Sequence, residues 1–198
     1  MNILICSTTQ SFFEHNRKIH YSVRKSLGFA IGLKNCGHSV YMLSRNYEDT
    51  FKGVKHISYR NIDKNFIKKI DLIFFTVEGH FEKCINYSEG LTWLIKEKYK
   101  NPNLKQKIIV KTGRESFLLK TEMGIEYYAK IIDYFLLQEK SLAETCKNNI
   151  KNISNAKVNY STMGTLNEPY NFGKSPYNKD KINLLYMGRI RQNPSRMP

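Results

Sequence analysis

The chain has 198 residues, 41% apolar and 13% aromatic, which is enough for one domain with a sizeable core and excludes a wholly disordered chain. No apolar run reaches the length that a membrane-spanning helix requires, and the four cysteines lack the paired spacing of a zinc site. The net charge of +15 has two explanations: a composition rich in lysine and asparagine, or an anionic partner such as nucleic acid, a membrane face or a phosphorylated substrate.

The first residues predict a buried strand and not a signal peptide, because the apolar run Ile3–Cys6 is short and no basic segment precedes it. The cysteines are scattered along the chain and lie in apolar surroundings. This pattern predicts reduced cysteines in the core of a cytoplasmic protein. They are Cys6, Cys36, Cys84 and Cys146.

From the amino terminus, apolar strands alternate with helices. Asn2–Ser7 is an apolar run typical of a strand that is covered on both faces, and a polar, basic segment follows it. Ser26–Leu33 carries apolar residues at helical spacing, and Gly37 is placed to end that helix. Ser39–Leu43 is the next apolar strand. These segments predict a β-α-β unit with parallel strands and a right-handed connection.

The same alternation continues to residue 161. It predicts a doubly wound α/β domain with a mainly parallel, Rossmann-like sheet flanked by helices. Such sheets bind ligands at the carboxyl ends of their strands, so the loops after strands are the first places to seek a site. The predicted segments are an edge-type strand at Val54–Tyr59, a helix at Asn65–Ile70, a central strand at Asp71–Val77, an amphipathic helix with exposed lysines at Ser88–Lys100, a strand at Lys107–Lys111, a helix at Ile125–Lys130, a strand at Tyr134–Leu137, a helix at Leu142–Asn149 capped by Ser141, and a strand at Val158–Ser161.

Glu78 and His80 follow the predicted central strand at its carboxyl end. A histidine there can shuttle a proton or donate a hydrogen bond to a sugar or phosphate, and a glutamate can accept from a substrate hydroxyl. The alternative is a polar loop that caps the next helix. Because loops at strand ends carry function in such folds, we favour a catalytic interpretation. No metal-ligand set, dinucleotide fingerprint or P-loop occurs in the sequence, which disfavours nicotinamide and ATP-hydrolysis chemistry.

Two basic segments are candidates for binding an anionic acceptor. Arg114 follows the strand Lys107–Lys111, and its guanidinium suits an anion, although a surface pair with Glu115 explains it equally well. The segment His15–Lys25 suits phosphate groups or single-stranded nucleic acid, and its length favours a lid or clamp. A solvated loop in a lysine-rich protein is the alternative. The candidate residues in this segment are His15, Arg17, Lys18 and His20.

The end of the chain carries a further candidate. Ile182–Met187 is an apolar strand that runs into Gly188 and Arg189, where glycine permits close backbone approach and arginine matches a diphosphate. Together with three earlier segments, this stretch resembles the interdomain region of retaining, nucleotide-sugar-dependent glycosyltransferases of the GT-B fold. Those segments are the helix-strand joint Asn35–Val40, the strand and helix start Ile131–Ser141, and the short strand ending in glycine at Lys157–Gly164.

The resemblance implies an acceptor-side Rossmann-like domain at residues 1–165, a linker at 166–181, and at 182–198 the start of a donor-binding domain that is otherwise missing. It implies that Gly188 and Arg189 bind the donor diphosphate and that His80 lies beside the donor sugar. A nucleotide sugar is the implied co-substrate, with no other cofactor and no metal. One departure is Ser7-Thr8-Thr9-Gln10, which stands where the family has a glycine-rich turn.

These observations predict part of a glycosyltransferase that transfers a sugar to an anionic acceptor, either modified DNA or a phosphorylated glycan or lipid. We expect it to be cytoplasmic, either free or peripheral at the inner membrane face, and to be nearly inactive without a donor domain. The alternative is a non-catalytic basic α/β module that binds nucleic acid. A flavodoxin-like response domain is disfavoured because no acidic cluster follows the first strand.

Overall fold

The computed structural model describes residues 1–7, 21–44, 48–77, 85–86, 88–112 and 124–160. The chain divides into two units, Met1–Leu166 and Asn167–Pro198, and all the described residues belong to the first. The predicted linker and donor-domain strand, residues 166–198, therefore lie outside the described residues. The predicted boundary at residue 165 stays a prediction.

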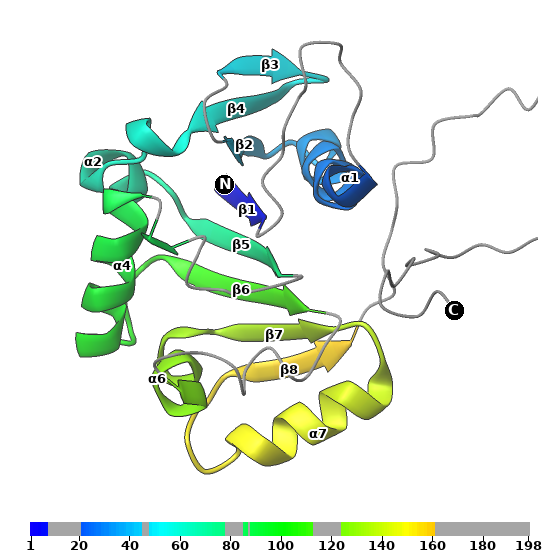
Figure 1. Cartoon of the computed structure of the whole chain (residues 1–198), viewed down its shortest axis with the longest axis vertical. Coiled ribbons are helices and arrows are strands. Elements are labelled where there is room, and N and C mark those ends of the chain that lie inside the picture. The colour runs from blue at the N-terminus through cyan, green and yellow to red at the C-terminus, as the bar shows by residue number, and fades with distance from the viewer. Residues whose placement is uncertain (8–20, 45–47, 78–84, 87, 113–123, 161–198) are drawn as a thin grey trace, which may run out of the picture. The chain divides into compact units, whose positions relative to one another are not determined.

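The first unit is built on an eight-stranded sheet with the order β3-β4-β2-β1-β5-β6-β7-β8 (Figure 1). All neighbouring strands run parallel except β3, which pairs antiparallel with β4. The predicted doubly wound, mainly parallel α/β fold is confirmed. The strands are β1 (Asn2–Ser7), β2 (Ser39–Ser44), β3 (Asp49–Phe51), β4 (Val54–Ser58), β5 (Leu72–Val77), β6 (Lys107–Thr112), β7 (Tyr134–Leu137) and β8 (Lys157–Tyr160).

Helices connect the parallel strands and begin or end at residues suited to that purpose. The helix after β1 is followed by Gly37, whose φ of +86° is the left-handed conformation that glycine adopts most easily. The helix before β6 is capped by Ser88, whose hydroxyl accepts a hydrogen bond from the Leu91 amide at 3.2 Å. The helices are α1 (Tyr21–Asn35), the 3₁₀ turn η1 (Tyr59–Asn61), α2 (Lys64–Lys68), α4 (Glu89–Lys100), α6 (Gly124–Ile131) and α7 (Lys140–Ile150).

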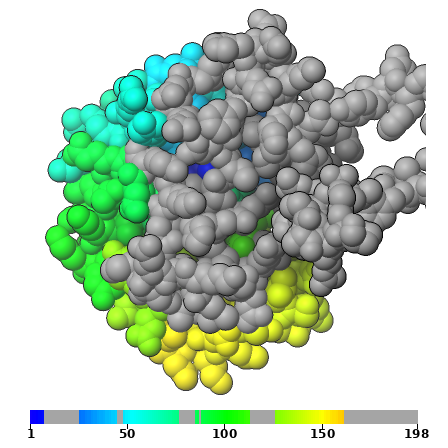
Figure 2. Space-filling view, in the orientation of Figure 1, coloured from blue at the N-terminus to red at the C-terminus, as the bar shows by residue number. Residues whose placement is uncertain are grey.

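Each face of the sheet has its own apolar core. On one face α1 packs through Leu27 and Ala30 against a group that includes Ile5 and Phe74. On the other face α2, α4, α6 and α7 cover a larger cluster that includes Phe75. Figure 1 shows α1 on the side of the sheet opposite to α2 and α4. In Figure 2 the described surface passes from β3 and β4 in cyan, through α4 in green, to α7 and β8 in yellow.

Several predictions about local structure were wrong. β4 is not an edge strand, because β3 pairs with its outer side. The predicted loop at 15–25 is helical from Tyr21 onward. Helix α7 begins earlier than expected, with Glu139 and not Ser141 at its N-cap. Cys36 is exposed, whereas Cys6 and Cys146 are buried as predicted; Cys84 lies outside the described residues.

Within the part of the chain that the structure describes, no helix is long and apolar enough to cross a membrane. The same residues contain no cluster of His, Cys, Asp and Glu side chains arranged to hold a metal ion.

Candidate functional site at the carboxyl ends of the central strands

The strand order changes direction at β1, which lies between β2 and β5. The connection from β1 to β2 passes over one face, through α1, whereas the helices that follow β5 cover the other face. In sheets of this kind the connections diverge at the reversal and leave a crevice at the carboxyl ends of the strands, where ligands bind. The carboxyl ends of β1, β5 and β6 are therefore the first place to look for a site.

None of the predicted site residues is among the described residues. The strands that precede two of the loops carrying them, β5 and β6, are described, however, and these strands are neighbours in the sheet. Glu78 and His80 come directly after β5, and Arg114 comes directly after β6, which lies beside it with Val77 paired to Thr112. The loops that carry these predicted residues thus begin side by side at the same edge. The others outside the described residues are His15, Arg17, Lys18, His20, Gly188 and Arg189.

A polar row crosses the sheet at this edge, on the face covered by α1. Ser7 of β1 is in register with Thr76 of β5, and Thr76 is in register with Lys111 of β6. Two residues earlier on the same strands, the corresponding row consists of Ile5, Phe74 and Ile109, all apolar. Side chains two residues apart on a strand lie on the same face. This face of the sheet therefore changes from apolar to polar within two residues, at the carboxyl ends of the three strands.

Helix α1 lies directly over the polar row. The Ser26 hydroxyl is 2.7 Å from the Thr76 hydroxyl, which in turn donates to the Cys6 carbonyl oxygen at 3.5 Å. One turn further along α1, the Phe29 ring stacks against Phe74 with 5.3 Å between the ring centres. The hydroxyl contact between Ser26 and Thr76 and the stacking of Phe29 on Phe74 therefore hold α1 against the carboxyl end of β5.

Lys111 brings a positive charge into this environment. Its side chain is only 3% exposed, and its ammonium lies 4.2 Å from the centre of the Phe29 ring. A cation over an aromatic face in a desolvated site is stabilised by about 2 kcal/mol, which offsets part of the cost of burial. On the opposite face of the same strand, Thr112 is also buried. The carboxyl end of β6 therefore carries a buried lysine side chain on one face of the sheet and a buried hydroxyl on the other.

Ser26, Thr76 and Lys111 were not predicted as site residues from the sequence. Lys111 was predicted only as the last residue of a strand, although a lysine at the end of the apolar run Ile108–Val110 is itself a signal. A strand buried on both faces has no solvent for an ammonium, so its charge requires a specific environment. The register that aligns it with Thr76 and Ser7 is a tertiary property, which no local pattern reveals.

No family model, no curated protein and no solved structure matches this chain. Its fold class is therefore established by the strand order and the placement of the helices, and its function is inferred from the chemistry of the site.

Proposed function

We propose that this chain is part of a glycosyltransferase of the GT-B type, in which the described α/β domain lies on the acceptor side. The polar row Ser7, Thr76 and Lys111 is the observation that supports this proposal, since it lies at the carboxyl ends of the central strands, where sheets of this kind bind ligands. The resemblance of residues 157–190 to the interdomain region of that family supports the choice of reaction.

In the proposed reaction the bond between the sugar C1 and the donor phosphate oxygen breaks, and a bond forms between C1 and an acceptor oxygen. The acceptor proton passes to a base, for which Glu78 and His80 are the candidates, and a nucleoside diphosphate leaves. Arg189 neutralises the negative charge that develops on the diphosphate, with Gly188 allowing close approach. Lys111 raises the electrostatic potential of the acceptor side and so favours an anionic acceptor.

The test is turnover and binding by the natural gene product with a panel of nucleotide sugars. We expect one of them to be consumed with release of its nucleoside diphosphate, as measured by mass spectrometry. Lys111→Met removes the buried charge without leaving a cavity, and should lower kcat/KM at least tenfold while the far-ultraviolet circular dichroism is retained. Lys96→Met, at an exposed position of α4, is the matched control and should be neutral. The proposal fails if no nucleotide sugar is bound or consumed.

The acceptor is tested by adding candidates to the same assay. Transfer to modified DNA, with binding that weakens steeply as salt is added, identifies nucleic acid as the acceptor. Transfer to a phosphorylated lipid in vesicles, without DNA binding, identifies a membrane acceptor and peripheral localisation. The net charge of +15 is compatible with either.

That charge also favours a second candidate function, a non-catalytic module that binds nucleic acid. It predicts salt-dependent DNA binding in a protein that neither binds nor consumes any nucleotide sugar. The panel assay combined with fluorescence anisotropy on labelled DNA separates the two candidates, because only the glycosyltransferase releases nucleoside diphosphate.

A further inference from the structure

A concave site lies at the opposite edge of the sheet from the polar row. It is an open pocket of about 520 Å³ at the amino ends of β6, β7 and β8, formed by the segments that connect α4, α6 and α7 to these strands. Its lining includes Lys107, Lys130, Lys151 and Lys157, and among the described residues that line it Asp133 is the one acid. The proposed glycosyltransferase reaction at the carboxyl ends does not use this edge.

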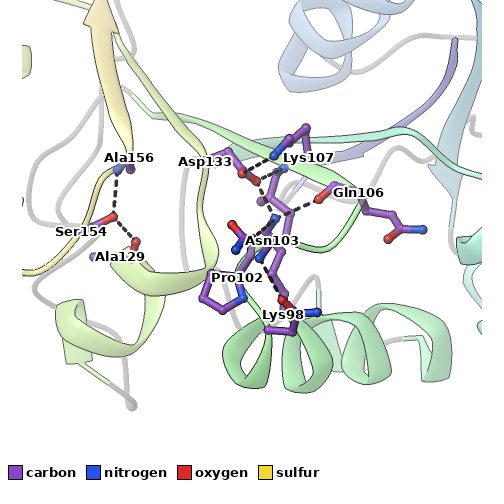
Figure 3. A network of polar contacts seen from close by, with 11 residues as sticks. Lys98, Pro102, Asn103, Gln106, Lys107, Ala129, Asp133, Ser154 and Ala156 are labelled. Carbon is purple, nitrogen blue, oxygen red and sulfur yellow. Dashed lines mark hydrogen bonds and ion pairs between the residues drawn. The ribbon is translucent and has the colours of Figure 1, made fainter.

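The charge of Asp133 is already compensated. Its carboxylate forms an ion pair with the Lys98 ammonium at 2.9 Å and accepts a hydrogen bond from the Lys107 ammonium at 3.2 Å (Figure 3). It also accepts a hydrogen bond from the Ile108 amide at 2.9 Å. Lys98 is 1% exposed and also donates to the carbonyl oxygens of Gln106 at 2.9 Å and Pro102 at 3.2 Å. This network ties the end of α4 to β6 and β7, and it carries a net charge of +1.

The other three lysines add their charges to that excess. Lys130, Lys151 and Lys157 are exposed, and no carboxylate of the described residues forms an ion pair with them. The ammonium of Lys130 lies 5.7 Å from the Tyr99 ring centre, and that of Lys157 lies 5.8 Å from the Tyr134 ring centre. Contacts with aromatic rings orient these side chains without neutralising them.

Helix dipoles explain only part of this arrangement. Lys130 is in the last turn of α6 and Lys151 is at the C-cap of α7, where a cation gains about 0.3–1 kcal/mol from the helix end. Lys157 is the first residue of β8, so no helix end accounts for its place. The positive charges converge on the pocket from three separate connections, and a helix-capping role does not require that convergence.

The walls of the pocket are held in place by their own hydrogen bonds. In the connection from α7 to β8, the Ser154 hydroxyl donates to the Ala129 carbonyl oxygen of α6 and accepts from the Ala156 amide at 3.0 Å (Figure 3). The amides of Ile153 and Ser154 both donate to the Ile150 carbonyl oxygen. A ligand therefore meets a wall that needs little ordering, which lowers the entropic cost of binding.

We propose that this pocket binds a small anion with two or more phosphate groups. Several ammonium groups around one acid that is already paired favour a multivalent anion over a single carboxylate. The volume falls within the range of about 300–1,000 Å³ that is usual for small-molecule sites, and a concave pocket suits a compact ligand better than it suits duplex DNA. Tyr134 lines the pocket and is 39% exposed, so its ring offers a surface on which the base of a nucleotide can stack.

The test is isothermal titration of the full chain with pyrophosphate, tripolyphosphate and nucleoside diphosphates at fixed ionic strength. We expect one equivalent of oligophosphate to bind, and the double variant Lys130→Gln/Lys157→Gln to weaken that binding at least tenfold. The control Lys69→Gln/Lys96→Gln removes the same charge at exposed positions outside the pocket and should change the affinity less than twofold. Lys111→Met should also leave it unchanged, because Lys111 belongs to the other edge.

The remaining outcomes are equally decisive. Tighter binding of a nucleoside diphosphate than of pyrophosphate supports the site with a nucleotide as its ligand, and equal affinity supports it with a free oligophosphate. Equal weakening by both double variants overturns the proposal, since it shows a response to net charge alone. Failure of the wild type to bind any oligophosphate at millimolar concentration, with duplex DNA binding that depends on Lys130 and Lys157, overturns it in favour of a nucleic-acid surface.

Discussion

His56 is a buried histidine in the sheet. Its side chain in β4 is 4% exposed, and burial lowers its pKa from the ordinary 6.5 to about 4, against the smaller opposing effect of the Asp49 carboxylate. Asp49 is its register partner on β3, so the effect that opposes burial comes from the strand that covers β4. At neutral pH the folded protein therefore holds this imidazole in its uncharged form.

This depressed pKa predicts a loss of stability in acid. Between pH 6.5 and about 4 the unfolded chain binds a proton at His56 that the folded protein does not, so stability falls as the pH falls through this window. The full effect is about 3 kcal/mol, and it levels off below pH 4, where both states are protonated. Urea midpoints at pH 7 and pH 4.5 measure it. In His56→Gln the difference between the two midpoints should shrink, and an undiminished difference would place the acid sensitivity at another residue.

Among the helices, the first turn of α4 packs closely against Ile62 and Asp63, the two residues that precede α2. The Gly90 amide donates to the Ile62 carbonyl oxygen at 2.9 Å, and the Ser88 hydroxyl donates to the same oxygen at 2.9 Å. A Cβ built at Gly90 would lie 2.7 Å from that oxygen and nearer still to the Asp63 carbonyl oxygen. These are backbone atoms, so neither neighbour can rotate away, and close packing of α2 on α4 depends on a glycine here.

Two glycine variants should consequently shift stability in opposite directions. Gly90→Ala forces α4 away from the α2 connection, and overpacking of this kind costs about 1–3 kcal/mol. Gly32 lies inside α1, and a Cβ added there would have nothing within 4 Å, so Gly32→Ala gains about 0.5–1 kcal/mol from the better helix propensity of alanine. Urea denaturation of both variants gives the comparison. If Gly90→Ala is as stable as the wild type, the contact between α2 and α4 is looser than these distances indicate.

How much of each element could be predicted depends on whether its signal is local. The apolar spacing within Ser88–Lys100 predicts that Leu91, Trp93, Leu94 and Ile95 form the apolar face of α4. The structure confirms that Leu91, Leu94 and Ile95 are buried, with Trp93 partly buried against the same core. The N-cap role of Ser88 was not predicted. Lys98 on the same helix was expected to be exposed but is buried. Its environment is supplied by Asp133 and by carbonyl oxygens outside the helix, which the spacing within α4 does not encode.

Strand β3 was missed for a related reason. Three residues are too few to show a period, and this strand exists because it pairs with β4, with Phe51 opposite Val54. The two residues between them, Lys52 and Gly53, both have positive φ, as a tight hairpin turn requires. The usual sequence signal for such a turn is Asn-Gly or Asp-Gly, because asparagine and aspartate tolerate positive φ. Here lysine, which rarely adopts that conformation, takes the first position, and the turn could not be recognised from the sequence.

The sequence indicated where to look for a site, but not which strand ends lie together or which side chains they carry. The alternation of strands and helices directed attention to the loops after β5 and β6, and the structure shows that these loops begin at adjacent strand ends. The row of Ser7, Thr76 and Lys111 depends on the register between strands that are distant in sequence. Hydrophobic patterning identifies strands, whereas partner and register are set by the packing of the whole sheet.

Over the whole chain, basic residues outnumber acidic residues. The chain carries 32 lysines and arginines against 17 aspartates and glutamates. Ion pairs such as Lys105–Asp71 at 2.8 Å and Lys64–Glu89 at 3.6 Å involve exposed lysines, and pairs of this kind contribute about 0–1 kcal/mol each. A net charge of +15 means that the remaining positive charges repel one another more in the compact folded state than in the expanded unfolded chain.

Screening that repulsion should stabilise the fold. The Debye length falls from about 10 Å at 0.1 M salt to about 3 Å at 1 M, so added NaCl weakens repulsion over longer distances more than it weakens contacts within an ion pair. We expect the Tm at pH 7 to rise by about 2–4 °C between 0.1 M and 0.5 M NaCl, which corresponds to about 1 kcal/mol for a chain of this size. The control Lys69→Gln/Lys96→Gln lowers the net charge by two without touching either proposed site, and it should show a smaller rise. A Tm that falls with NaCl would contradict this prediction, because it would mean that the attraction screened by salt outweighs the repulsion.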